Sequence, residues 1–243
     1  MASQLRELVD CWMAWGGIDE SLAPSLDELE SGFGGPSDPT RPGAEPAVIN
    51  AWEHRHSYRL PYGLRAWLML SNGLFREGPL IHPIAAIGPM VIFSRIHDLL
   101  VQPESWFELG NPNVETVCID LAYRWPSGGY PVFSSGDEAL GSSPRIIARS
   151  FEEWFLELLR HGGTEYWCDS GFEDFGDPWQ AHRHYTPQPE LPAHLLPFTK
   201  LVLPMMQARV EEREIARSLG LSDTDVELLF RHLQHVVPRL TAS

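Results

Sequence analysis

The sequence predicts an α+β fold, a mostly antiparallel twisted sheet flanked by helices, with helical or irregular extensions at both ends. Two segments with apolar residues at helical spacing come first, between about residues 46 and 72. Short β-branched and aromatic clusters separated by Gly, Pro and Asn follow, as is typical of antiparallel strands. The clearest amphipathic helix, Ser150 to Arg160, comes after them, so helices precede and follow the sheet.

The length of 243 residues allows one large domain, or one ordinary domain with extensions. Hydrophobic residues make up 43% of the chain and exclude wholesale disorder, because such a chain can offset its ordering entropy by burial. We divide the chain into an acidic N-terminal helical arm and linker (residues 1–45), an α+β domain (46–163) and a C-terminal extension (164–243), irregular at first and then two helices.

The first half of the chain carries the helix signals. Apolar residues at helical spacing predict a helix from Leu5 to Trp15, followed by a short acidic helix around Leu26 to Leu29 and a linker. Pro46 suits the first turn of the next helix, and Leu60-Pro61 opens another. Asn72-Gly73 is expected to end that helix in a left-handed conformation.

Strands are expected from the clusters Leu80 to Ile87, Met90 to Phe93, Val114 to Leu121 and Tyr130 to Phe133. The helix from Ser150 to Arg160 begins with a Ser150/Glu153 capping box and ends at Gly162. Residues 164–196 show no period and predict a long ordered loop or a wrapping extension. Two further helices are expected, one from about Met205 to Leu219 and one capped by Ser222.

This order of elements resembles the SUKH superfamily. The matching pieces are Glu53, Leu60-Pro61, Leu64, Asn72-Gly73, Val117 to Leu121, Pro131 to Phe133 and Ile147 to Trp154. They span residues 46–163, about half the chain, whereas Leu74 stands where the family often has a second Gly. The family includes bacterial immunity proteins that neutralise toxins and a Smi/Knr-type regulator of fungal cell-wall assembly. The resemblance implies a non-catalytic protein that binds a protein partner, such as a toxin enzyme, and blocks it.

Charge and composition exclude several partners. The 33 acidic and 18 basic residues give a net charge of −15, so we expect no nucleic acid partner. No run of about 20 apolar residues and no basic-then-apolar leader occur, so we expect a cytoplasmic protein without a membrane partner. Three widely spaced cysteines predict free thiols rather than a disulfide framework.

Metal and catalytic constellations are weak. His182 and His184 with Cys168 and Asp169 form the best metal candidate, but they lack the spacing of a zinc motif, and we expect no metal and no cofactor. Between residues 167 and 184, acids alternate with aromatic residues, and a carboxylate pair there could serve a glycoside hydrolase. An acidic loop whose aromatic residues dock on the core explains the same pattern, and we expect no enzyme.

The last two helices offer an alternative function. Ala216, Gly220 and Val226 have the spacing at which two helices cross in a helix-turn-helix, which favours a transcription-associated regulator. The second helix, however, opens with Asp223, Asp225 and Glu227, which would repel phosphates. A regulator would need a basic face formed by Arg209, Arg213, Arg217 and Arg231.

The predicted partner site lies on loops of the α+β domain. Asp137 and Glu138 offer acids beside the aromatic residues Trp125 and Tyr130, a combination typical of interface hot spots. The net charge would steer the chain toward a cationic partner, such as a toxin domain that must hold a nucleic acid.

Overall fold

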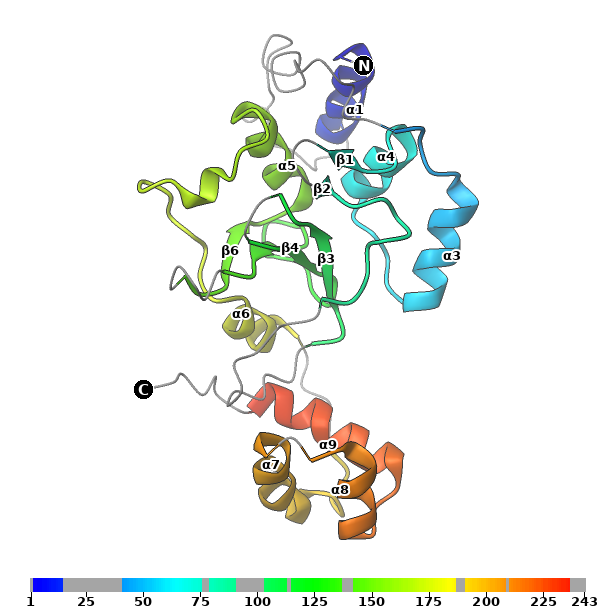
Figure 1. Cartoon of the computed structure of the whole chain (residues 1–243), viewed down its shortest axis with the longest axis vertical. Coiled ribbons are helices and arrows are strands. Elements are labelled where there is room, and N and C mark those ends of the chain that lie inside the picture. Colours follow the sequence, from blue (N-terminus) through cyan, green and yellow to red (C-terminus); the bar gives the residue numbers. More distant parts are fainter. Residues whose placement is uncertain are drawn as a thin grey trace. The chain divides into compact units, whose positions relative to one another are not determined.

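The computed structural model describes residues 2–14, 41–75, 79–90, 103–112, 115–136, 142–186, 191–208 and 210–236 (Figure 1). The chain divides into two compact units. The first comprises Met1–Met90 and Ser105–Tyr185, and the second comprises Val91–Glu104 and Thr186–Ser243. The first unit therefore continues beyond residue 163, where the sequence placed the end of the α+β domain, to the end of helix α6 at Tyr185.

Among the described residues, the first unit opens with helices α1 (Ala2–Ala14), α3 (Pro46–His56) and α4 (Tyr62–Leu70). Helix α1 places Leu5 and Val9 in the main apolar core. Helix α3 begins at Pro46, as predicted, because proline lacks an N–H that the first turn could not pair. The predicted helix around residues 26–29 lies outside the described residues.

Two buried glutamates fix the beginning of α4. Glu53 of α3 accepts a hydrogen bond from the Leu60 N–H at 3.0 Å and pairs with Arg65. Glu152 of α5 (Phe151–Arg160) accepts one from the Gly63 N–H at 2.8 Å. A β-carbon at position 63 would collide with the Glu152 carboxylate, so only glycine allows this approach.

The central sheet is antiparallel in the order β3-β4-β5-β6, with strands β3 (Trp106–Gly110), β4 (Val117–Asp120), β5 (Val132–Ser134) and β6 (Arg145–Ala148). Strands β1 (Leu74–Phe75) and β2 (Pro79–Ile81) form a separate antiparallel hairpin. The chain therefore has the predicted α+β fold with antiparallel sheets and flanking helices. Strands β1, β3 and β6 were not predicted, and residues 91–93 of the predicted strand Met90 to Phe93 lie outside the described residues.

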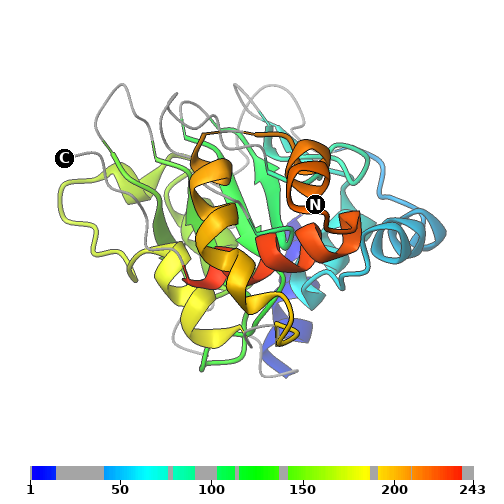
Figure 2. The same cartoon turned by 90° about the horizontal axis from the view of Figure 1, so that it is seen from below.

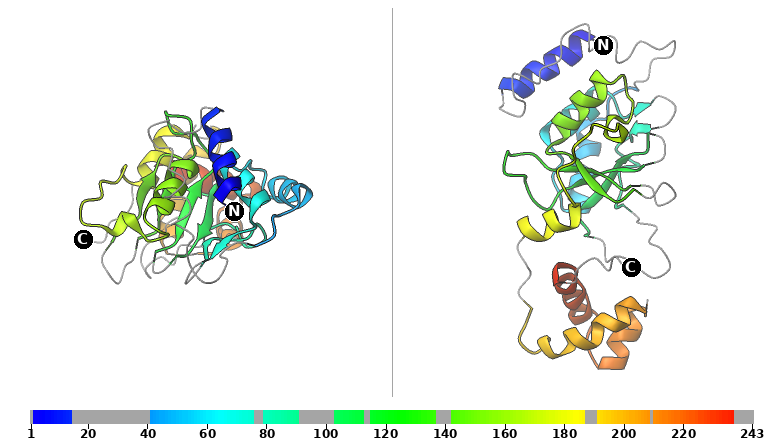
Figure 3. Two further views of the ribbon diagram at one scale, coloured as in Figure 1. Left: turned by 90° about the horizontal axis from the view of Figure 1, so that it is seen from above. Right: turned by 90° about the vertical axis from the view of Figure 1, so that its left-hand side faces the viewer.

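The two faces of the sheet differ. Neighbouring residues of a strand point to opposite faces, and Phe107 and Ile119 belong to the main apolar core on one of them. On the other face Trp106 contacts Phe133 and Trp179, with ring centroids 4.6 and 4.8 Å apart. Trp179 lies on helix α6 (Pro178–Tyr185). Figure 1 and the right-hand view of Figure 3 show the sheet between α5 and α6.

Helix α5 forms as predicted. The Ser150 Oγ accepts the Glu153 N–H at 3.1 Å, and Gly162, with φ of 61°, follows the last turn. The return half of the capping box is shifted by one residue, because the Glu153 carboxylate accepts the Arg149 N–H at 2.6 Å. Trp154 is fully buried.

Residues 164–185 wrap around the sheet. After the 3-10 turn η2 (Tyr166–Cys168), the chain pairs with the outer edge of β6, where the Phe175 N–H donates to the Ile146 carbonyl at 2.9 Å. The prediction that this region lacks helices was wrong at α6. The Asp177 carboxylate caps that helix by accepting the Trp179 N–H at 2.7 Å.

The second unit contains η3 (Leu196–Phe198) and helices α7 (Thr199–Gln207), α8 (Glu212–Leu219) and α9 (Asp223–Val236). Figure 2 shows α9 running behind α7, with α8 beside the first turns of α9. The predicted single helix from Met205 to Leu219 was wrong, because the chain turns after Gln207, where the Val210 N–H donates to the Met205 carbonyl at 3.0 Å. Helix α9 begins after Ser222, as predicted.

Two further predictions need correction. The cluster Leu80 to Ile87 leaves strand geometry after Ile81, because Pro83 starts a turn in which its carbonyl accepts the Ala86 N–H at 2.8 Å. Gly73 has a positive φ of 110°, but Asn72 does not, and its side-chain oxygen instead accepts the Ile84 N–H at 2.8 Å. Among the described residues, no helix is long and apolar enough to cross a membrane.

Candidate functional site

Asp120, at the end of β4, is the centre of a buried polar cluster. Its carboxylate is 1% exposed and accepts hydrogen bonds from Ser105 Oγ at 2.7 Å, Trp106 Nε1 at 2.9 Å and the Ala122 N–H at 2.9 Å. Its Oδ2 also lies 2.6 Å from Nδ1 of His182 on α6. Four donors therefore hold one buried carboxylate in a fixed orientation.

A row of aromatic rings begins beside this cluster. Tyr123 stacks on Tyr185 of α6, with centroids 5.2 Å apart. Trp125 lies 5.7 Å from Tyr185 and 6.5 Å from Phe175. We call Tyr123, Trp125, Phe175 and Tyr185 the aromatic face. Exposure rises along the row, because Tyr123 is buried, Trp125 and Tyr185 are partly exposed, and Phe175 is 39% exposed.

Tyr123 keeps its proton across the physiological range. Burial raises the pKa of its hydroxyl well above the usual range, and the neighbouring Asp120 carboxylate raises it further. Tyr123 can therefore donate a hydrogen bond, but it is unsuited to act as a base.

The loop between β4 and β5 holds Trp125 rigidly. The Trp125 N–H donates to the Gly129 carbonyl at 2.6 Å, and the Gly128 N–H donates to the Trp125 carbonyl at 2.7 Å. Gly128 has a φ of 105°, which this turn requires. A β-carbon on Gly129 would lie only 2.8 Å from the Arg149 carbonyl oxygen, so the loop is packed against the start of α5.

Two arginines lie over rings in this region. Arg149 lies 5.1 Å from the centroid of Phe175 and pairs with Glu153. Its hydrogen bond to Glu153 raises the pKa of the Arg149 guanidinium, so the charge is permanent. Arg124 lies 5.4 Å from the centroid of Tyr130.

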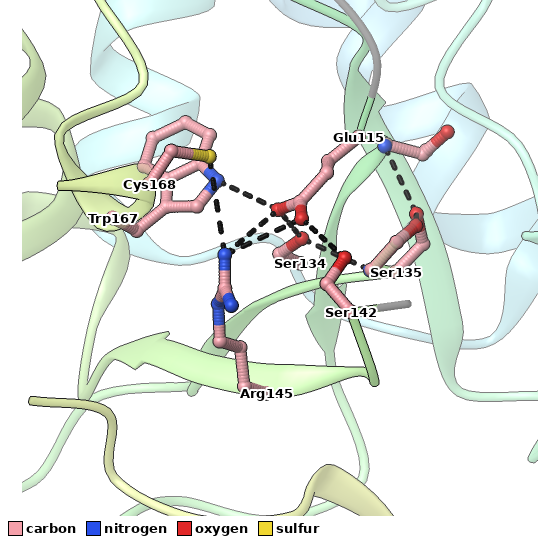
Figure 4. A network of polar contacts seen from close by, with 9 residues as sticks. Glu115, Ser134, Ser135, Ser142, Arg145, Trp167 and Cys168 are labelled. Atoms are coloured by element: carbon pink, nitrogen blue, oxygen red, sulfur yellow. Dashed lines mark hydrogen bonds and ion pairs between the residues drawn. The ribbon is translucent and has the colours of Figure 1, made fainter. Parts of the chain in front are cut away.

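A second polar cluster surrounds Glu115 (Figure 4). The buried carboxylate accepts hydrogen bonds from Ser134, from Ser142 at 2.9 Å and from Trp167 Nε1 at 3.0 Å. Arg145 pairs with it at 3.3 Å. Four segments of the chain meet at this carboxylate, so Glu115 ties the turn η2 to the strands.

The structure describes two of the four residues of the predicted partner site and gives them different surroundings. Trp125 belongs to the aromatic face, while Tyr130 is partly buried and packs against the main apolar core. Asp137 and Glu138 lie outside the described residues. Sequence reasoning missed Tyr123, Tyr185 and the contact between Asp120 and His182, which are 62 positions apart.

The metal candidate is dispersed over two clusters. Cys168 Sγ lies 3.9 Å from an Arg145 nitrogen, whereas His182 contacts Asp120. Burial raises the pKa of the Cys168 thiol, with a further contribution from Glu115, so the thiol is not activated as a ligand. Within the part of the chain that the structure describes, no three His, Cys, Asp or Glu side chains are grouped to hold a metal.

The acids of the hydrolase candidate have local roles. Asp174 accepts the Gly176 N–H at 2.9 Å, and Asp177 caps α6. Asp169 and Glu173 are exposed. The neighbouring Trp167 and Trp179 are buried in the first unit, as expected for an acidic loop whose aromatic residues dock on the core.

The helix-turn-helix spacing is found in the second unit. Ala216 and Val226 are buried, and Gly220 has a φ of 66° at the end of α8. Asp225 and Ser222 cap α9 reciprocally, because the Asp225 carboxylate accepts the Ser222 N–H at 3.2 Å and Ser222 Oγ accepts the Asp225 N–H at 3.1 Å. These hydrogen bonds from Ser222 lower the pKa of Asp225, so its negative charge is permanent.

A scan of the sequence against protein-family models finds no match, and a search of the curated proteins finds none either. An assignment of function therefore depends on the residues and contacts of this chain.

Proposed function

We propose that this chain is a non-catalytic protein that binds a protein partner through the aromatic face. The observation that carries the proposal is the row from Tyr123 to Phe175, in which the buried Tyr123 ring is followed by rings of increasing exposure. Trp and Tyr are enriched at binding hot spots because a rigid ring contributes a large contact area at a small cost in side-chain entropy. Both hydrogen bonds of the Trp125 backbone fix the loop that carries its ring before any partner binds.

The buried acids support a role without catalysis. General acid–base chemistry needs a carboxylate within hydrogen-bond reach of a substrate. The carboxylates of Glu53, Glu115, Asp120 and Glu152 instead accept hydrogen bonds from donors of this chain. Glu53 joins α3 to the start of α4, and the other three join segments that are distant in sequence, which is a structural use of a buried charge.

The class of partner comes from the resemblance to the SUKH superfamily and from charge. The resemblance implies an immunity protein that occludes a toxin, or a related regulatory adaptor. A net charge of −15 would steer the chain toward a cationic toxin domain and would raise the association rate. This chain would then bind protein, with no cofactor and no nucleic acid.

Co-expression with toxin domains encoded beside this chain tests the proposal, with rescue of growth as the readout. Trp125→Ala should abolish rescue by a chain that still folds. Tyr62→Ala is the matched control, because Tyr62 is an aromatic residue 40% exposed on α4.

A second experiment tests the role of charge. The association rate with a toxin that this chain neutralises, measured by stopped flow, should fall as salt is added. Rescue that survives Trp125→Ala would exclude the aromatic face, and an association rate indifferent to salt would exclude steering.

The alternative function is a transcription-associated regulator. It is favoured by the crossing of α8 and α9 at Ala216, Gly220 and Val226. The acids that open α9 oppose it, since a recognition helix presents its first residues to DNA.

A further inference from the structure

We propose that the hydrogen bond between Asp120 and His182 is a latch that docks helix α6, and that docking of α6 assembles the aromatic face. The inference rests on the proposed function only where it concerns partner binding. His182 would then be a positioning residue, acting through Tyr185 on the same helix.

Helix α6 depends on docking. It has 8 residues, and isolated helices shorter than about 12 to 15 residues are marginal in water. Its buried residues include Trp179 and His182, three positions apart and therefore on one side of the helix. Trp179 packs on Trp106, and His182 contacts the carboxylate of Asp120. These two side chains attach α6 to the second face of the sheet.

The aromatic face has a fixed part and a removable part. Trp125 is held by its own turn, and Tyr123 follows β4 directly. Tyr185 is the last residue of α6, and it contacts both of these rings. Undocking of α6 would withdraw Tyr185 and leave Trp125 in place, so the face is complete only while the latch is closed.

The latch can open without breaking the core. When His182 leaves, Asp120 keeps three donors, from Ser105, Trp106 and Ala122, so opening does not strand a bare buried carboxylate. The main apolar core lies on the opposite face and includes no residue of α6. Opening of α6 should therefore be a local event, separate from global unfolding.

Hydrogen exchange of the full chain at increasing low urea concentrations tests the latch without a partner. In the wild type, α6 amides should exchange through an opening that is insensitive to urea, while β4 amides exchange only with global unfolding. His182→Leu should speed α6 exchange about tenfold or more, as expected for loss of one hydrogen bond to a charged group, and leave α5 exchange unchanged. His182→Asn, whose amide can replace Nδ1 as donor, should restore most of the protection. Gln180→Leu is the control, because Gln180 is exposed on the same helix.

Several results would overturn the latch. The first is that the α6 amides of the wild type exchange only with global unfolding. The second is that His182→Leu speeds amide exchange in α5 and α6 equally. The third is that exchange in His182→Asn is as fast as in His182→Leu. If His182→Leu does not fold, α6 exchange in the wild type and in His182→Asn still tests the latch. Once a partner is known, Trp125→Ala should block binding with α6 exchange unchanged. If hydrogen exchange shows the latch but no protein partner binds, only the proposed function is refuted. If His182→Leu binds the partner as tightly as the wild type does, the role of Tyr185 is refuted.

Discussion

The two units of this chain are built in opposite ways. The core of the first collects residues from Leu5 to Trp167, and its polar clusters join segments as distant as Asp120 and His182. The core of the second lies within residues 195–233, on η3 and three short helices joined by short turns. The second unit is therefore held by contacts between residues close in sequence, whereas the first depends on contacts that no local pattern contains.

The largest effect is expected in the core of the first unit. Trp154→Ala should lower its free energy of unfolding by about 3–5 kcal/mol, because Trp154 is fully buried and its truncation leaves a cavity. All nine tryptophans lie in the first unit, so urea denaturation followed by tryptophan fluorescence reports on that unit alone. Val48→Ala is the control, since Val48 is 49% exposed. A midpoint equal to that of the wild type would contradict the burial of this face of α5.

A smaller, local effect is expected in the second unit. Gly220→Ala should cost about 1 kcal/mol, because alanine is strained at a φ of 66°. An added β-carbon meets no atom within 4 Å, so the cost comes from the backbone alone. Far-UV circular dichroism should detect the loss, while the tryptophan transition stays unchanged. Gly171→Ala, which has equal space and no positive φ, should be neutral, and a shift of both transitions would mean that the units unfold together.

The sequence predicted the elements that depend on local signals and missed those that depend on distant contacts. Signals from residues a few positions apart predicted helices α1, α3, α4 and α5, strands β4 and β5, the cap at Ser150 and the α8–α9 turn. Trp125 was named as a partner-binding residue because aromatic residues and acids occur together on its predicted loop, and that role stays a prediction. Tyr185 was not named and His182 was named only as a metal candidate, because their contacts form only when α6 reaches the second face of the sheet. The break between α7 and α8 was missed because helical periodicity continues across it.

A pH experiment distinguishes a buried charge from an exposed one. Burial raises the pKa of Glu152 above its ordinary value of 4.5. The folded chain therefore binds this proton more tightly than the unfolded chain, and the stability that Glu152 contributes is lost as pH rises from about 4.5 through the raised pKa. Glu152→Gln retains an acceptor for the Gly63 N–H and removes the charge, so it should gain stability relative to the wild type as pH rises.

The measurement is tryptophan-monitored urea denaturation at a series of pH values. Glu7→Gln, at an exposed position on α1, is the control and should follow the wild type at every pH. A Glu152→Gln curve parallel to the wild type would show that Glu152 titrates alike in both states, and the burial argument for this residue would fail.

The smallest effect is expected where a local motif is most suggestive. The second unit has the helix-turn-helix crossing, yet it should not bind duplex DNA at physiological salt. A phosphate at the start of α9 would meet Asp223 and Glu227, which are exposed, and the reciprocal bonds of Ser222 and Asp225 already use the donors there. Gel shifts of the full chain should show no complex, and Arg213→Ala with Arg217→Ala should change nothing. A shift abolished by those two substitutions would mean that a basic side of α8 outweighs the acids of α9, and the regulator would then replace the partner-binding protein as the better account of this chain.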